Sequence, residues 1–316
     1  MLLQKLKGKV SVPTPVQSMI DRSIDRTKDT YIPGFHGFSL FEVWRAFIAQ
    51  LRKTSLIERA AAISFNMVMA IPPTLLFIFT LIPHLPISGK FIEELYSVIR
   101  DVVPGKQNNA VIIEFLDDFL LHPRNELLSF GLLLALFFSS NAMMGVLRSF
   151  DKDYEGFEKW NGLKKRQTAL MLTLISFVLF FLFLSLLIAQ GVVLDWVGIR
   201  NKVLRLLIIN IRWVFIVMLI FYIVSFIYRH GPSVTRKWHF FTPGSVFTTT
   251  LVMLATGLFS FWVNHFSNYN KLYGSISAIF IIMSLIFVNS LVVLMGFELN
   301  VTIAALLRKK EAEKQL

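Results

Sequence analysis

Six long runs of apolar residues constrain this chain more than any other feature of its sequence. Each run is about 20 residues or longer, the length that a helix needs to cross a hydrocarbon layer about 30 Å thick. Only the fourth run contains an internal charge, Arg212, and the sixth ends on Glu298. The predicted fold class is therefore all-α, a polytopic membrane protein built on a six-transmembrane-helix bundle. Its spans are predicted at 60–82, 127–147, 169–194, 206–228, 242–263 and 275–298.

Lysine and arginine are distributed unevenly between the segments that connect these runs. If the N-terminus lies inside, the inner segments carry 23 of these cations and the outer segments carry 8. Positively charged segments resist translocation, so the sequence predicts a multi-pass topology with both termini in the cytoplasm, N-in and C-in. The same asymmetry accounts for the formal charge of +12. A nucleic-acid partner is therefore not expected.

The segments outside the predicted spans have patterns of their own. A basic N-terminal segment, 1–37, precedes an amphipathic helix at 38–59, and a basic tail, 305–316, closes the chain. The helix carries an apolar stripe, which predicts a helix lying in the membrane interface. The alternative is a helix that packs against the protein itself. The stripe consists of Phe41, Trp44, Ile48 and Leu51.

The first outer segment contains two further apolar stripes, which Pro104-Gly105 separates. This pattern predicts an extracytoplasmic helical hairpin at 85–121. Such stripes must cover an apolar surface, which leaves two interpretations open. The hairpin either caps its own bundle or docks an envelope partner.

Several polar or helix-breaking residues lie within the predicted spans, where an unpaired polar group costs several kcal/mol. Pro72 and Pro73 remove two backbone donors near the middle of the first span, so we expect the helix to bend or break there. Broken helices at membrane depth often border a cavity. These residues define a hypothetical substrate pathway: Asn66, Pro72, Pro73, Asn141, Arg212, Asn289, Glu298 and Asn300.

Glu298 and Arg212 are predicted at opposite ends of the bundle and therefore cannot pair with each other. Arg212 lies toward the outer side, where it either reaches the lipid headgroups or lines a polar cavity. Glu298 lies at the inner end and should meet a cation from another helix end. Such a pair most often clamps helices together. The candidate partners are Arg59, Arg148, Arg166 and Arg229.

With these features in place, the chain resembles the YihY/BrkB family of bacterial inner-membrane proteins, once labelled ribonuclease BN. The resemblance runs from about Arg59 to Ala304. It implies a six-helix inner-membrane protein with proposed links to envelope integrity and to the movement of lipid precursors, and it supplies no catalytic residues. The matching blocks are Arg59-Ala60-Ala61-Ala62, Pro72-Pro73, Arg148-Ser149-Phe150, Asp153-Tyr154-Glu155, Pro243-Gly244, Tyr269-Asn270, Tyr273-Gly274-Ser275 and Gly296-Phe297-Glu298-Leu299-Asn300.

The residues needed for enzymatic chemistry do not form a recognisable pattern. The chain has no cysteine, and its six histidines are dispersed over both predicted sides of the membrane. Neither a nuclease metal site nor a Gly-rich phosphate loop is indicated. We therefore expect no enzyme activity, no cofactor and no bound metal.

Two classes of function remain open. The chain is either a transporter, a translocation pathway for a lipid or another amphiphile in envelope biogenesis, or a non-transporting scaffold. Membrane lipids are the expected partners of the first, and an envelope protein is the expected partner of the second. No clear G-x-x-x-G face appears in any span, so the sequence leaves the oligomeric state open.

The predicted sidedness is testable because the chain contains no native cysteine. The variants Asp101→Cys and Lys164→Cys should react with a membrane-impermeant maleimide from opposite faces of the membrane. Intact cells should label only the first variant, and permeabilised cells should label both. Labelling of both sites from one face would contradict the topology.

Overall fold

The computed structural model describes residues 28, 30–81, 96, 113, 114, 117, 125–151, 154, 156–196, 202–235, 237–265 and 276–315. Side chains at 79, 125–127, 184–196, 202–213, 263–265 and 276–279 lie outside this description. Of the predicted hairpin at 85–121 only residues 96, 113, 114 and 117 are described, and of the segment 1–37 only residues 28 and 30–37. The long helices are α3 (Leu40–Lys53), α4 (Leu56–Leu81), α7 (Asn125–Phe150), α8 (Gly162–Trp196), α9 (Lys202–His230), α10 (Pro243–His265) and α12 (Ile276–Lys314).

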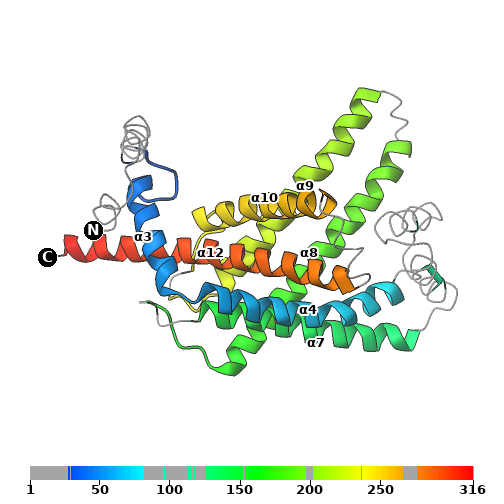
Figure 1. The fold of residues 1–316 in the computed structure, drawn as a ribbon, viewed down its shortest axis with the longest axis horizontal. Coiled ribbons are helices and arrows are strands. Elements are labelled where there is room, and N and C mark those ends of the chain that lie inside the picture. The colour runs from blue at the N-terminus through cyan, green and yellow to red at the C-terminus, as the bar shows by residue number, and fades with distance from the viewer. Residues whose placement is uncertain are drawn as a thin grey trace.

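Each of the six predicted spans falls on one long helix, namely α4, α7, α8, α9, α10 or α12 (Figure 1). Among the described residues, five of these helices are long and apolar enough to cross a membrane. The sixth, α9, contributes a shorter apolar stretch, Val214–His230, although its backbone is helical from Lys202. The prediction of an all-α polytopic membrane protein is confirmed.

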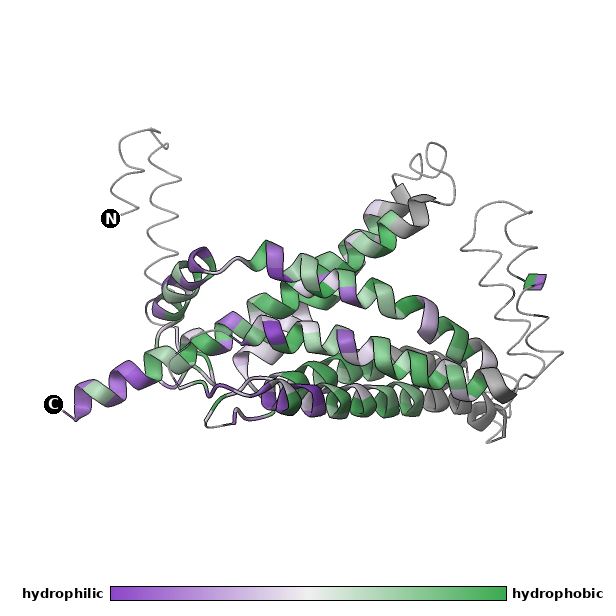
Figure 2. Ribbon diagram, turned by 90° about the horizontal axis from the view of Figure 1, so that it is seen from below, coloured by the Kyte–Doolittle hydropathy of each residue, from purple (hydrophilic) through white to green (hydrophobic). Residues whose placement is uncertain are grey.

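Large apolar side chains remain exposed along the outside of these helices. Figure 2 shows that hydrophobic residues, drawn in green, predominate along the membrane helices. Leu133 is 67% exposed, Val178 is 59% exposed and Leu258 is 68% exposed. A soluble protein rarely exposes apolar surface so continuously. The surrounding medium must therefore be hydrocarbon along this part of the molecule.

The six membrane helices form a closed ring of neighbours. Helix α4 packs against α7 and α12, α7 continues to α8, α8 to α9, α9 to α10, and α10 returns to α12. Helix α3 stands apart from the ring and lies across α12 near the chain's C-terminal end (Figure 1). Every membrane helix thus has two principal partners, and α12 has α3 as a third.

Helix α12 continues well beyond the predicted end of its span. It runs without a break to Lys314, so the residues predicted as a basic tail extend the membrane helix. The sequence beyond Asn300 is rich in alanine, leucine, lysine and glutamate, which all favour helix. Leu299 and Ile303 on this extension pack against Val43 and Phe47 of α3.

Helix α3 begins with a capping box, in which the Ser39 and Glu42 side chains each accept a hydrogen bond from the other's backbone amide. Its apolar arc is wider than the predicted stripe. Val43 and Phe47 are buried against α12, whereas Trp44 is 50% exposed and Ile48 is 36% exposed. One half of the arc therefore packs on protein, and the other half is available to the membrane interface.

Helix α4 passes through Pro72 and Pro73 without interruption. Beside the prolines, the Thr74 hydroxyl donates to the Ala70 carbonyl at 2.7 Å and lies 3.4 Å from the Ser139 hydroxyl of α7. The helix break that Pro72 and Pro73 could have caused is thus absent. Helix α4 therefore tolerates the loss of the two backbone donors, and it packs against α7.

The loops 151–161 and 231–242 meet at one end of the ring, together with α3 and the extension of α12. An isolated bridge joins Phe157 to Val234, and the Glu158 amide donates to the Ser233 carbonyl at 2.6 Å. Gly156 adopts a φ of +76°, and the Arg308 guanidinium occupies the place where a Cβ at residue 156 would stand. We call this assembly of two loops, α3 and residues 299–314 the basic end.

Helices α10 and α12 approach each other closely at two glycines, Gly244 and Gly296. A Cβ at Gly296 would collide with the Thr248 hydroxyl and lie 2.7 Å from the Tyr228 hydroxyl. A Cβ at Gly244 would collide with the Gly296 carbonyl. Neither position has room for a larger residue, so the ring closes here only because both side chains are hydrogen atoms.

Replacing Gly296 with alanine should therefore destabilise the fold, although alanine favours helix. We expect a loss of about 1–3 kcal/mol in the free energy of unfolding, measured by thermal or denaturant unfolding in detergent. Gly257→Ala, on the neighbouring helix α10, is the matched control, because a Cβ at that position would meet no atom within 4 Å. Equal effects of the two substitutions would contradict the close contact.

Candidate functional site

The carboxylate of Glu298 is the most deeply buried charge among the described residues, with no exposed surface. Its oxygens accept three side-chain hydrogen bonds. Arg59 Nη1 and the Tyr154 hydroxyl each lie 2.7 Å from Oε1, and Gln50 Nε2 lies 3.1 Å from Oε2. These donors come from α4, the 151–161 loop and α3, so one carboxylate on α12 holds three other segments. We call these four residues the Glu298 cluster.

Arg59 extends the cluster to a fifth segment. It lies near the start of α4 and is itself 8% exposed, and its second terminal nitrogen donates to the Ser149 carbonyl at the end of α7. Buried charges are tolerated when they are paired and when their remaining hydrogen-bonding groups find partners. In the Arg59–Glu298 pair, both carboxylate oxygens and both terminal nitrogens of the guanidinium have hydrogen-bond partners. The remaining guanidinium nitrogen, Arg59 Nε, has none.

Tyr154 acts in the cluster as a hydrogen-bond donor. Burial raises the pKa of its hydroxyl well above the usual value, and the Glu298 carboxylate raises it further. The hydroxyl therefore stays protonated across the physiological pH range and continues to donate to Glu298.

Aromatic rings fill the centre of the helix ring directly beside this cluster. Phe297 stacks on Phe150, with centroids 4.1 Å apart and planes 13° from parallel, and Trp238 lies 5.8 Å from it. Tyr228 contacts both phenylalanines, and its hydroxyl donates to the Val293 carbonyl at 2.6 Å. Phe150, Tyr228 and Phe297 come from α7, α9 and α12, which are not successive in the ring, and Trp238 comes from the 231–242 loop. Their contact closes the ring's interior at the basic end.

Asn300, one turn beyond Gly296, caps the first turn of α10. Its side-chain oxygen accepts a hydrogen bond from the Gly244 amide at 2.9 Å, and its amide nitrogen donates to the Thr242 hydroxyl at 3.0 Å. The first amides of a helix have no partner within the helix, so this contact satisfies one of them. Asn300 is thus engaged in holding α10 against α12.

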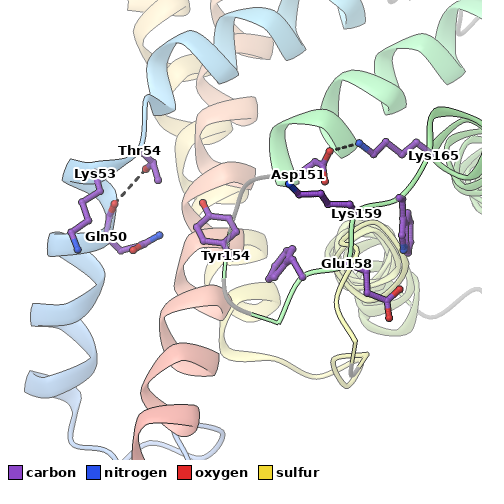
Figure 3. Close-up of a pocket in the computed structure, with 10 residues that line it drawn as sticks. Gln50, Lys53, Thr54, Asp151, Tyr154, Glu158, Lys159 and Lys165 are labelled. Atoms are coloured by element: carbon purple, nitrogen blue, oxygen red, sulfur yellow. Dashed lines mark hydrogen bonds and ion pairs between the residues drawn. The ribbon is translucent and has the colours of Figure 1, made fainter.

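An open pocket of about 960 Å³ adjoins the Glu298 cluster at the basic end (Figure 3). It lies between the last turn of α3, the 151–161 loop and the start of α8. Two members of the cluster, Gln50 and Tyr154, also line this pocket. Its charged lining includes Lys53, Asp151, Glu158, Lys159 and Lys165.

Of the four cations predicted as partners of Glu298, the structure brings only Arg59 to it. Arg166 instead donates to the Asn141 amide oxygen at 2.5 Å. Arg229 lies over the ring of Phe240, 4.7 Å from its centroid, and Arg148 is exposed.

The other predicted pathway residues are spread along the bundle. The Asn66 amide donates to the Ala62 carbonyl at 2.8 Å and faces Gly145 of α7. The Asn289 amide lies 3.4 Å from the Thr256 hydroxyl of α10. The side chain of Arg212 lies outside the described residues. Asn66, Asn141 and Asn289 each contact a different partner, so these amides do not form a single site.

Sequence reasoning missed two members of the cluster and the whole pocket. Tyr154 lies within the block Asp153-Tyr154-Glu155 that carries the family resemblance, which was the available signal. Gln50 lies on the polar flank of α3, and no sequence signal pointed to it. Among the described residues, no group of three or more histidine or acidic side chains could hold a metal ion. The absence of enzyme activity stays a prediction.

Comparison with known proteins gives one family and two named relatives. The model of the family described as virulence factor BrkB matches residues 47–315. The putative ribonuclease-like protein YfkH of Bacillus subtilis (strain 168) is 30% identical over 260 residues, which cover 80% of this chain and 90% of that protein. A UPF0761 membrane protein of Chromohalobacter salexigens is 24% identical over 261 residues, which cover 77% of this chain and 58% of that protein. No solved structure matches the chain.

Disrupting the ion pair should destabilise the protein more than disrupting a partly exposed pair. Glu298→Gln and Arg59→Gln should each lower the free energy of unfolding by about 3–5 kcal/mol, because each leaves a buried charge without its counter-ion. The double variant should lose clearly less than the sum of the two.

The matched control is Lys165→Gln, which breaks the partly exposed contact with Asp151. It should lower stability by about 1 kcal/mol or less. Unfolding of all four variants in detergent measures the difference. Strictly additive losses for Glu298 and Arg59 would show that the two side chains do not act as a pair.

Proposed function

Since this chain belongs to the virulence factor BrkB family of membrane proteins, as its resemblance to YihY/BrkB proteins predicted, we propose that it forms a pathway for a lipid or another amphiphile across the bacterial inner membrane. One observation carries the proposal: an open polar pocket adjoins a buried charged cluster at one end of an apolar helix ring. An amphiphile needs both an apolar surface for its chains and a polar site for its headgroup.

We assign the basic end to the cytoplasm. The inner segments of the predicted topology carry 23 lysines and arginines, against 8 on the other side, and the two loops at this end and the extension of α12 belong to the richer group. The exposed half of the α3 arc, with Trp44 and Ile48, then lies at headgroup depth. In this orientation the pocket is open to lipid headgroups of the inner leaflet.

The polar contacts at different depths support movement of a headgroup better than transport of a small ion. Asn289 and Glu298 are nine residues apart on α12, or about 14 Å along the helix axis. The Asn289–Thr256 contact is partly exposed between α10 and α12. A headgroup can exchange hydrogen bonds with such sites in turn, while its acyl chains remain in the bilayer.

Reconstitution into liposomes tests this function directly. Fluorescent phospholipid in the inner leaflet becomes accessible to a membrane-impermeant reductant only after it crosses the bilayer. Liposomes that contain the protein should lose more fluorescence than protein-free liposomes of the same composition. Equal signals from both would contradict lipid movement.

A deletion of residues 85–121 separates this function from that of a scaffold. A pathway formed by the helix ring should continue to move lipid without the outer segment, provided that the variant folds as judged by size-exclusion chromatography. A scaffold that docks an envelope protein through this segment should move no lipid in either form and should lose its partner on deletion.

A further inference from the structure

The pocket at the basic end contains chemistry that neither the Glu298 cluster nor the family assignment explains. Its volume of about 960 Å³ falls within the range of sites that hold small molecules. Figure 3 shows Tyr154 of the 151–161 loop between α3 on one side and the Asp151–Lys165 pair on the other. The pocket therefore has room for a headgroup with several heavy atoms.

Three lysines line this pocket against two carboxylates. Lys53 comes from α3, Lys159 from the loop and Lys165 from α8, so the positive groups surround the space from three segments. Asp151 pairs with Lys165, and the lining as a whole carries a net charge of +1. The balance of charge favours an anionic group, and a phosphate is the anion that lysine clusters commonly bind.

Exposed apolar side chains lie close in sequence to residues that line the pocket. Ile57, four residues after Lys53, is 69% exposed, and Leu163, two residues before Lys165, is also 69% exposed. A free anion makes no favourable contact with exposed apolar side chains, whereas the acyl chains of a lipid can pack beside them. Lysines in the pocket together with exposed apolar residues nearby in the sequence favour a lipid phosphate over a soluble one.

Two pocket residues are also ligands of the buried carboxylate. Gln50 and Tyr154 line the pocket, and both donate to Glu298. A phosphate oxygen in the pocket would compete with Glu298 for these donors. Binding in the pocket is thereby linked to the contact that joins α3 and the loop to α12.

We propose that this pocket binds the phosphate of an anionic lipid headgroup through Lys53, Lys159 and Lys165, and that binding draws Gln50 and Tyr154 away from Glu298. The site rests on the proposed function, because it names the class of amphiphile that enters the pathway. It also makes a separate claim about equilibrium binding, which can be tested without any transport.

The binding test uses the full-length protein in a non-ionic detergent, titrated calorimetrically with dihexanoyl phosphatidylglycerol or with inorganic phosphate. The short-chain lipid should bind and inorganic phosphate should bind at least about tenfold more weakly. The double variant Lys53→Gln/Lys159→Gln should bind the lipid about 30-fold more weakly than the unmodified protein, because each lysine near an anionic lipid contributes about 1 kcal/mol.

The matched control is Lys309→Gln/Lys314→Gln, which removes the same charge from exposed positions on α12 that do not line the pocket. It should bind the lipid as the unmodified protein does. Three outcomes would overturn the site: no binding of the lipid, equal affinity for inorganic phosphate, or equal weakening in both double variants.

The linkage to the Glu298 cluster is tested by a distance measurement. Spin labels on Arg52→Cys in α3 and Lys309→Cys in α12 report the separation of these helices, and the absence of native cysteine keeps the labelling specific. Saturating lipid should shift the distance distribution, and an unchanged distribution would overturn the linkage.

The liposome assay distinguishes failure of the site from failure of the proposed function. Lipid binding to the pocket without lipid movement would leave the site standing and remove the transport proposal. Undiminished lipid movement by Lys53→Gln/Lys159→Gln would remove the site from the pathway and leave transport standing.

Discussion

The fully buried carboxylate of Glu298 is the interaction on which the basic end depends. A charge without solvent is tolerated only when partners surround it, and the partners here belong to α3, α4 and the 151–161 loop. Through Arg59 the same charge also reaches the end of α7. The need to pair this buried charge thus holds together segments that are distant in the sequence. The same contacts hold Gln50 and Tyr154 in place at the wall of the open pocket.

Five consecutive residues of α12 show how one helix satisfies several neighbours. Successive residues of a helix turn by about 100°, so each faces a different direction. Gly296 lies against α10, Phe297 stacks on the ring of Phe150, and Glu298 faces α4 and α3. Asn300 returns to the face of Gly296 four residues later and caps α10. The order of these residue types is therefore dictated by the order of the surrounding helices.

The positions of the membrane helices could be predicted from the sequence because hydrocarbon demands long apolar runs. The end of α12 could not, since charges end an apolar run without ending a helix. The sequence limited the partner of Glu298 to four arginines, and Arg59 was among them, yet the choice among them depends on how α4 and α12 pack.

The features that sequence missed depend on assembly. Tyr154 lies in a loop that has no periodicity, and Gln50 becomes relevant only once α3 crosses α12. The predicted stripe of α3 failed to identify Val43 and Phe47 as the buried face, because both halves of the arc are equally apolar. A site built from three or more segments is hard to recognise in the sequence of any one of those segments.

The length of α12 has a mechanical consequence. A continuous helix of 39 residues extends about 58 Å, nearly twice the thickness of the hydrocarbon layer. Its far part therefore projects from the bilayer as a stiff rod, and α3 rests on that rod. A tilt of only a few degrees within the membrane would displace the tip by several ångströms. Any tilt of α12 within the membrane would therefore also move its extension and the α3 helix that packs on it.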